Sequence, residues 1–202
     1  MTVILDYGVG NLFSLQSSLQ HIGEKALVSS DETLIRSADR LILPGVGAFR
    51  DAREKLAKNG LDKIVCEEAE RGKPLMGICL GMQLLFTRSF EFGETEGLGL
   101  LAGNVRPIEP LIPHGLKVPH IGWNSLKMCG KPEIFQYIED GAYVYFVHSF
   151  AAMDCEGSVI ATMDYGIELT AAVQCGNVLG MQFHPEKSGE TGLRILRAFC
   201  EM

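Results

Sequence analysis

The sequence lacks the features that mark membrane, exported and nucleic-acid-binding proteins. No apolar run approaches the ~20 residues that a membrane-spanning helix needs, and no basic stretch precedes a long apolar core at the N-terminus. Lys and Arg number 18 against 25 Asp and Glu, which gives a net charge of -7 without a basic cluster. Because nucleic-acid phosphates are bound by clustered Lys and Arg, we expect no nucleic-acid partner, no export and no membrane insertion.

Cysteine pairs and metal-ligand clusters are also missing. The six cysteines include no Cys-x-x-Cys pair, and none groups with the five histidines at metal-ligand spacing. Disulfide frameworks belong to oxidising compartments, whereas scattered single cysteines are typical of reduced thiols. The sequence therefore predicts a cytoplasmic protein with no metal ion and no cofactor.

The composition is that of one globular domain. A hydrophobic fraction of 47% and a charged fraction of 21% over 202 residues allow a substantial core. Neither an internal repeat nor a low-complexity linker divides the chain, and the loosest stretch is Ser89 to Gly99, rich in Gly and Glu. We therefore expect residues 1–202 to form a single domain.

The first half of the chain alternates strand and helix patterns. The expected strands are residues 3–5, 26–28, 41–43 and 75–78, and the expected helices are residues 12–22, 49–56 and 61–69. Gly23 follows the first helix at the position where glycine commonly ends helices. Strands alternating with helices over short crossovers predict an α/β fold with a parallel sheet covered on both faces and reactive groups at its carboxyl edge.

The second half reads differently. Closely spaced strands are expected at residues 144–150, 159–163, 171–175 and 178–183, followed by a helix at about 190–200. Gly176-Asn177 is typical of a two-residue hairpin turn. These patterns predict an antiparallel extension of the parallel sheet.

Cys79 lies at a strand-to-helix turn flanked by glycines. The segment Leu75-Met-Gly-Ile-Cys79-Leu-Gly81-Met-Gln83 passes from an apolar strand directly into a helical run. Such a turn strains the backbone of its apex residue, and Gly77 and Gly81 leave room where side chains would collide. Because the first turn of a helix favours thiolate, the sequence predicts a nucleophile. The alternative is a small buried apolar side chain in a tight turn.

Far downstream, a predicted strand runs into His184-Pro185-Glu186-Lys187. A thiol nucleophile needs an imidazole base whose second nitrogen is held by an acceptor. Side chains two residues apart in an extended segment point to the same side, so we expect Glu186 to reach the ring of His184. A surface turn with a solvated Glu is the alternative. Together with the turn at Cys79, the pattern favours a Cys-His-Glu triad.

A third apolar strand ends in Pro44-Gly45-Val46-Gly47. Attack on an acyl carbon creates an oxyanion, which backbone N–H donors stabilise, one of them usually just after the nucleophile. We expect Leu80 to provide that donor and the loop at Gly45 and Val46 to provide a second, because glycines let the backbone approach a ligand. A plain strand-to-helix turn is the alternative.

These three motifs, in this order, resemble the class I (triad) glutamine amidotransferases over essentially the whole chain. Sister glutaminases for anthranilate, carbamoyl phosphate or pyridoxal phosphate share the Cys and the His-x-Glu, but the remaining motifs are more similar to the glutaminase subunits of imidazole glycerol phosphate synthases. The five segments that carry this resemblance are Leu5 to Leu12, Leu43 to Phe49, Gly77 to Phe86, Pro119 to Asn124 and Gln182 to Ser188.

The resemblance implies a glutaminase that works through a Cys79 thioester and delivers ammonia to a (β/α)8-barrel cyclase subunit. That partner makes imidazole glycerol phosphate and aminoimidazole carboxamide ribotide in histidine biosynthesis. Gln83 and Glu91 match positions that contact the amino-acid head of glutamine, and the backbone around His148 and Ser149 matches its carboxylate site. The family thus supplies four expected substrate contacts.

The resemblance also implies a docking face around the ammonia exit. Its matching positions are Asn11, Trp123, Asn124 and Lys187. Trp123 is the only tryptophan, a residue type favoured at interfaces, although a single Trp needs no partner. We expect these residues to meet the cyclase subunit.

Three other function classes were weighed from the residues. A dinucleotide site at Gly8-x-Gly10 fails because Phe13 stands where the third glycine belongs. A binding subunit without chemistry is disfavoured because Cys79, His184 and Glu186 are all present. A cysteine peptidase or other hydrolase on a similar sheet is the remaining alternative, and the expected glutamine contacts argue against it.

Overall fold

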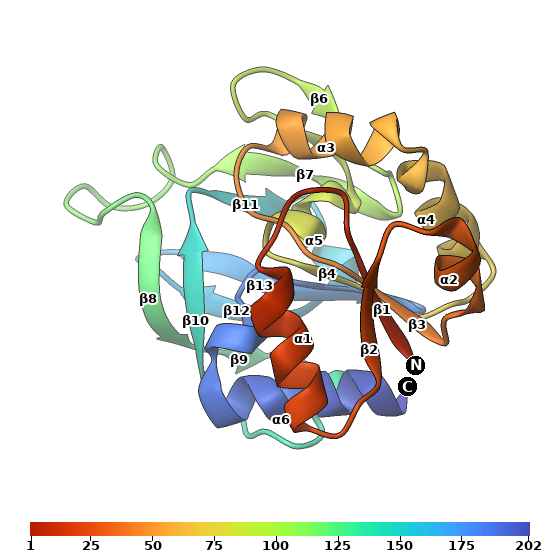
Figure 1. The fold of residues 1–202 in the computed structure, drawn as a ribbon. Coiled ribbons are helices and arrows are strands. Elements are labelled where there is room, and N and C mark those ends of the chain that lie inside the picture. The colour runs from red at the N-terminus through yellow and green to blue at the C-terminus, as the bar shows by residue number, and fades with distance from the viewer.

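The main sheet of the protein carries the expected α/β architecture. The computed structural model describes residues 1–202, and its largest sheet has eight strands in the order β2-β1-β3-β4-β14-β13-β12-β9 (Figure 1). These strands are β1 (Thr2–Leu5), β2 (Ala26–Ser29), β3 (Arg40–Leu43), β4 (Leu75–Ile78), β9 (Lys127–Met128), β12 (Val159–Asp164), β13 (Glu168–Cys175) and β14 (Val178–Met181). The first five strands in the sheet order run parallel and the last three pair antiparallel, which confirms an antiparallel extension for the strands expected at 159–163 and 171–175. The strand expected at 178–183 is β14, which instead runs parallel to β4, and the strand expected at 144–150 lies outside this sheet.

Helices cover both faces of this sheet (Figure 1). The long helices are α1 (Leu12–His21), α3 (Phe49–Lys58), α4 (Leu61–Glu70) and α6 (Gly189–Glu201), and the short ones are α2 (Glu32–Ser37) and α5 (Leu80–Leu84). Successive strand side chains alternate between faces. Ile4 accordingly packs in one core cluster with α1 and α6, while Val3 packs in another with α2, α3 and α4. Two buried cores of 28 and 26 residues therefore stabilise the sheet from opposite sides.

Two smaller sheets flank the main one. They contain β8 (His120–Ser125) and β10 (Tyr143–His148) in one, and β5 (Phe86–Ser89), β6 (Thr95–Glu96), β7 (Leu101–Pro107) and β11 (Phe150–Met153) in the other. The expected single strand at 144–150 is wrong, because the chain exchanges partners at Ser149: β10 pairs with β8, and β11 pairs with β7. Ser149 lies between the two strands, and its carbonyl oxygen accepts from the backbone N–H of Ile108 over 3.0 Å.

Other departures from the sequence expectations are local. Helix α2 was not expected, because its six residues are too few for a clear period, and Asp31 caps it by accepting from the N–H of Leu34. The stretch from Ser89 to Gly99 holds the short strand β6. Three 3-10 helices complete the chain: η1 (Glu133–Phe135), η2 (Glu156–Ser158) and η3 (Pro185–Lys187). The chain contains no helix whose length and apolar character would let it cross a membrane.

The carboxyl ends of the parallel strands gather the predicted reactive residues. Strands β3, β4 and β14 are neighbours, and they end at Leu43, Ile78 and Met181. Parallel strands present their carboxyl ends at one edge, so the residues that follow them meet there. The next positions hold the Pro44 loop, Cys79 and the segment leading to His184.

Candidate active site

The turn at Cys79 has the strained geometry expected of an elbow between β4 and α5. Cys79 has φ of 54° and ψ of -111°, a region that side chains rarely occupy. A Cβ added to Gly81 would lie 1.8 Å from the carbonyl oxygen of Leu43, and one added to Gly77 would lie 2.7 Å from the backbone of Gly81. Gly77 is therefore required for β4 and α5 to pack this closely, and Gly81 for α5 to pack against the end of β3, and this packing holds Cys79 at the apex.

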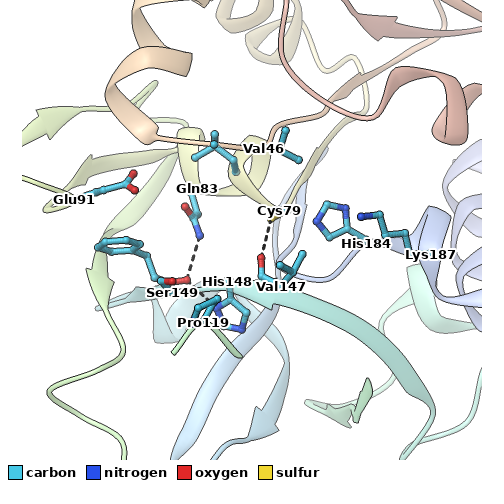
Figure 2. Close-up of a pocket in the computed structure, with 13 residues that line it drawn as sticks. Val46, Cys79, Gln83, Glu91, Pro119, Val147, His148, Ser149, His184 and Lys187 are labelled. Carbon is cyan, nitrogen blue, oxygen red and sulfur yellow. Dashed lines mark hydrogen bonds between the residues drawn. The ribbon is translucent and has the colours of Figure 1, made fainter. Parts of the chain in front are cut away.

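His184 lies beside Cys79 (Figure 2), and its imidazole is hydrogen-bonded to Glu186. The Nδ1 atom of His184 is 2.8 Å from Oε1 of Glu186, and the two side chains are only 3% and 4% exposed. The Nε2 atom of His184 is buried without a hydrogen-bond partner. The imidazole is therefore oriented through one nitrogen and free to exchange a proton through the other.

The local backbone that brings Glu186 to His184 differs from the expectation. The two residues were expected in an extended segment, but only His184 has extended angles, and Pro185 begins the 3-10 helix η3. Pro185 fits this position because its missing N–H costs nothing at the first turn of a helix. Glu186 therefore reaches the imidazole from within a tight turn.

The charge environment of His184 favours its protonated form. Burial would lower the pKa of this imidazole, but the neighbouring Cys79 and Glu186 side chains outweigh burial and raise the pKa to about 9. An imidazolium beside a sulfur can stabilise a thiolate and later donate a proton to a leaving group. The arrangement can thus perform nucleophilic attack and general acid catalysis.

The loop after β3 lies against the elbow. A Cβ added to Gly45 would lie 2.7 Å from the backbone nitrogen of Gly81, so the loop and the elbow pack at backbone distance. The hydroxyl of Tyr7 donates to the carbonyl oxygen of Pro44 over 2.6 Å and fixes the start of the loop. Burial and a charge on Cys79 raise the pKa of Tyr7, which keeps it a neutral donor. Val46 lines the pocket directly above Cys79 (Figure 2).

Gln83 is buried in a chain of amide contacts that reaches the nucleophile. Its Nε2 atom donates to the carbonyl oxygen of Phe150 over 3.1 Å and to Oε1 of Gln182 over 3.0 Å. Gln182 in turn donates to the sulfur of Cys79 over 3.8 Å. The side-chain nitrogen of Gln83 is therefore committed to internal contacts, while the residue still lines the pocket.

His148 is part of a pair of buried histidines. Its Nδ1 atom lies 2.9 Å from the carbonyl oxygen of Phe150, and its Nε2 atom lies 3.2 Å from Nδ1 of His120. A carbonyl can only accept, so we assign the proton of His148 to Nδ1, and Nε2 then accepts from His120. Burial, aided by His120 and His184, lowers the pKa of His148 to about 4. His148 is therefore neutral, in contrast to His184.

Glu91 and Ser149 lie at the end of the pocket away from His184 (Figure 2). The Oε2 atom of Glu91 accepts from the backbone N–H of Phe49 at the start of α3 over 2.6 Å. Ser149 occupies the break between β10 and β11, where its backbone belongs to neither strand. This end offers an anion and loop backbone, which suit an ammonium and a carboxylate.

The pocket brings most of the predicted site residues together. It encloses about 410 Å³. The predicted residues that line it are Val46, Cys79, Leu80, Gln83, Glu91, His148, Ser149, His184 and Lys187. Gly45 packs beneath the elbow, and Glu186 lies behind His184. No cluster of three or more His, Cys, Asp or Glu side chains is placed to hold a metal ion.

The predicted docking residues lie outside the pocket, apart from Lys187. Trp123 is 54% exposed and meets the ring of Tyr145 edge-on, and the Lys187 ammonium lies 5.8 Å from the centre of the same ring. Asn124 donates to the carbonyl oxygen of Asp164 over 2.6 Å, so its side chain is held within the chain. Asn11 is exposed at the start of α1 and makes no side-chain capping bond. Lys187 thus connects the pocket with the exposed aromatic face.

Three further residues of the site were not predicted from the sequence. They are Tyr7, His120 and Gln182. Each falls in a segment that carried the family resemblance, but the segment gave no reason to single out the side chain. Tyr7 and Gln182 contact the site from strand ends, and that position in a parallel sheet was the one available signal.

The comparisons with known proteins agree with this geometry. A family model described as glutamine amidotransferase class-I matches residues 3–202. The chain is 49% identical over 203 residues to the imidazole glycerol phosphate synthase subunit HisH of Caldanaerobacter subterraneus subsp. tengcongensis, covering 100% of this chain and 98% of the relative. It is 46% identical to the subunit of the same name from Oceanobacillus iheyensis, covering 100% and 99%.

Solved structures show the same fold at lower identity. A crystal structure of a glutamine amidotransferase superposes with a TM-score of 0.77 at 22% identity, covering 98% of this chain and 97% of that one. The structure of PurLQS from Thermotoga maritima gives a TM-score of 0.73 at 22% identity, covering 99% and 97%. At this identity the likeness is one of fold.

Proposed function

The chain belongs to the class I glutamine amidotransferase family, and on that premise we propose how its pocket hydrolyses glutamine. It is a glutaminase subunit of imidazole glycerol phosphate synthase and serves histidine biosynthesis, as its full-length relatives indicate. The observation that carries the residue assignment is the bond of His184 to Glu186 beside the strained Cys79 elbow. We assign the whole of residues 1–202 to one glutaminase domain.

The reaction runs through a thioester on Cys79. The thiolate attacks the side-chain amide carbon of glutamine, and the new oxyanion is held by the N–H of Leu80 and by the loop at Gly45 and Val46. The imidazolium of His184 protonates the departing nitrogen, so the C–N bond breaks and ammonia leaves. Neutral His184 then takes a proton from water, whose oxygen attacks the thioester and releases glutamate and Cys79.

The other end of the pocket binds the amino-acid head of glutamine. Glu91 faces the ammonium, and the backbone around His148 and Ser149 faces the carboxylate. Gln83 supports this end, since its amide nitrogen holds the Phe150 carbonyl that His148 also contacts. A free amino acid satisfies both charges, whereas an internal peptide residue has neither, which disfavours a peptidase.

Ammonia is consumed by a partner subunit. The relatives are synthase subunits, so the chain works with a second subunit. We assign that partner to a (β/α)8-barrel cyclase in a heterodimer, docked over Asn11, Trp123, Asn124 and Lys187. The contact of Lys187 with both the pocket and the Tyr145 ring supports an ammonia exit on this side. The six unpaired cysteines support a cytoplasmic location.

Glutamine hydrolysis wastes ammonia when no acceptor substrate is bound to the partner subunit. A change in the conformation of the Pro44 loop could prevent this by switching hydrolysis on and off. Gly47 has φ of +95° and open space where a Cβ would lie, so the loop can reorient between its ends. Docking of the cyclase and binding of its ribonucleotide favour the orientation that completes the oxyanion hole. A missing oxyanion donor lowers the rate about a hundred- to a thousandfold, so the free chain should hydrolyse glutamine very slowly.

The test is glutamate release from glutamine, measured with the chain alone, with a candidate cyclase, and with cyclase plus ribonucleotide. We expect activity to rise at each addition, mainly through kcat. A peptidase or an unrelated hydrolase depends on neither addition. Full activity of the isolated chain would contradict the switch, while absence of glutamine hydrolysis in the liganded complex would contradict the proposed function.

A further inference from the structure

The loop assigned to the oxyanion hole is fixed at both ends and free between them. At its start, Tyr7 donates to the carbonyl oxygen of Pro44 over 2.6 Å. At its end, the backbone N–H of Phe49 donates to Oε2 of Glu91 over 2.6 Å. Between these points, Val46 is 44% exposed and a Cβ on Gly47 would meet no atom within 4 Å. Gly45 packs on the elbow, so the backbone at Val46 and Gly47 is positioned by that contact together with the two anchors.

Helix α3 has no cap of its own, and Glu91 replaces it. The N-cap residue Ala48 has no side-chain oxygen and makes no side-chain capping bond. Helix starts usually satisfy their free N–H groups with a Ser, Thr, Asp or Asn at this position, as Asp31 does for α2. Glu91 supplies the acceptor from 42 positions further along the chain, and its charge suits the positive end of the helix.

The segment that carries Glu91 is itself fastened. The backbone N–H of Glu91 donates to the hydroxyl of Ser89 over 3.2 Å, and Ser89 is fully buried. On the far side of the segment, Nε of Arg50 in α3 donates to the hydroxyl of Thr95 over 3.2 Å. The β5–β6 connection and the first turn of α3 are thus clasped together, with the carboxylate between them.

We propose that Glu91 is a positioning residue for the oxyanion loop, in addition to the ammonium contact assigned above, and this inference rests on the proposed function. Only Oε2 of Glu91 makes a hydrogen bond within the chain, to Phe49, so Oε1 is available to the ammonium of glutamine. One carboxylate then serves both the amino-acid head of the substrate and the helix that ends the loop. Glutamine bound at the Glu91 end of the pocket therefore stabilises the loop at Gly45 and Val46. That loop in turn stabilises the oxyanion formed in the reaction.

The two roles of Glu91 should affect different kinetic constants, KM and kcat. A residue that only contacts the ammonium changes KM, whereas misplacing an oxyanion donor changes kcat. Glu91→Gln keeps an oxygen that can accept from Phe49 but removes the charge. Glu91→Ala removes the charge and the acceptor. In the complex with partner subunit and ribonucleotide, both variants should raise KM at least about tenfold, while only Glu91→Ala should also lower kcat about tenfold or more.

A second-site variant tests the cap directly. Ala48 has φ of -84° and ψ of 140°, the extended conformation that capping residues adopt, and it is only half-buried. Adding Ala48→Asp to Glu91→Ala gives the first turn of α3 a local acceptor, which reaches the N–H of Arg50 or Asp51 rather than that of Phe49, without restoring the ammonium contact. We expect kcat to return to within about threefold of the parent while KM stays high. The matched control is Glu94→Gln, an exposed carboxylate of the same loop that pairs with Arg88 and should change neither constant.

Hydrogen exchange of the segment around Phe49 reports the cap independently of turnover. Protection there should fall in Glu91→Ala, stay near the parent in Glu91→Gln, and return in the double variant. Equal kcat in Glu91→Gln and Glu91→Ala would overturn the proposal. So would a double variant that regains exchange protection but not kcat. If the parent complex releases no glutamate, the proposed function fails instead, and exchange still decides whether Glu91 caps α3.

Discussion

The two ends of the pocket are built on different principles. The reactive end, with Cys79 and His184 (Figure 2), lies past the ends of the adjacent strands β4 and β14: Cys79 directly follows β4, and His184 lies a short way beyond Met181 at the end of β14. The recognition end, with Glu91 and Ser149, comes from connections within the smaller sheets. Adjacent parallel strands fix the first end through their own hydrogen bonds, whereas the second depends on how separate sheets pack. The reactive end is therefore positioned by directly hydrogen-bonded strands of the main sheet.

A histidine at each end shows the contrast. His184 faces the sulfur of Cys79 and a buried carboxylate, and its pKa is raised to about 9. His148 faces a carbonyl and a second imidazole, and burial lowers its pKa to about 4. The same side chain is thus kept protonated beside the Cys79 sulfur and neutral beside the Phe150 carbonyl, which agrees with the roles proposed for the two histidines. Burial lowers the pKa of both imidazoles, and only His184 has the neighbouring Cys79 and Glu186 side chains that outweigh burial.

The largest effect is expected at the reactive end. Cys79→Ala should lower glutamine hydrolysis by roughly 10⁴-fold or more, because no other group can form the thioester. Thermal unfolding should change little, since alanine keeps the Cβ that already tolerates the strained angles. With the partner present, synthesis supplied with an ammonium salt should survive. Glutamate release by the complex is the measurement.

The control for this change is Cys66→Ala, a half-buried cysteine on α4 that does not line the pocket. It should leave turnover unchanged. Glutamine-dependent activity that persists in Cys79→Ala would remove the nucleophile assignment and, with it, the division of the pocket into two ends.

A smaller loss is expected for the residue behind the base. Glu186→Gln should lower kcat about a hundredfold with little change in KM, because it removes the charge that favours and orients the His184 imidazolium. Steady-state kinetics of the liganded complex provide the measurement. A rise in KM with unchanged kcat would instead make Glu186 a substrate contact. It would then contradict the assignment of substrate binding to the recognition end alone.

At the recognition end, His120→Phe should act on binding. It leaves Nε2 of His148 buried without a partner, which costs about 1–3 kcal/mol and disturbs the backbone at Ser149. We expect KM for glutamine to rise about tenfold and kcat to change less than threefold. Tyr165→Phe, which keeps the ring stacked on His120 and loses only a bond to Lys117, is the control. A fall in kcat alone would show that the pair serves the reactive end.

The smallest effect is on stability against pH. Between the ordinary histidine value near 6.5 and about 9, the folded chain holds a proton on His184 that the unfolded chain has released, so stability falls as pH rises through this window. Between 6.5 and about 4, the unfolded chain binds a proton that His148 refuses, so stability falls as pH falls.

Each limb should be worth on the order of 1 kcal/mol in the free energy of unfolding. Denaturant titrations across pH 4 to 9, compared between the parent, His184→Gln and His148→Gln, measure the two limbs. Each substitution should flatten its own limb only. Identical pH profiles in all three proteins would mean that neither histidine contributes to the pH dependence of stability, which would contradict the prediction.

Much of the fold and of the reactive end was predictable from the sequence. The alternation of apolar runs predicts the parallel strands, and Gly77, Cys79 and Gly81 predict the elbow, because backbone sterics at one turn are a local matter. The recognition end was less accessible. The strand at 144–150 was wrong because its two halves pair with different strands, and strand pairing is not encoded in the apolar period of either half.

What the sequence determined by itself is the set of residues with local causes: the elbow at Cys79, the His184 and Glu186 pair two positions apart, and the order of the strands along the chain. Only the tertiary structure decided that His120 meets His148, that Gln182 reaches Cys79 and that Glu91 caps a helix starting at Phe49. These contacts join residues 28, 103 and 42 positions apart. Such partners are chosen by the packing of whole sheets and helices, which no short stretch of sequence contains.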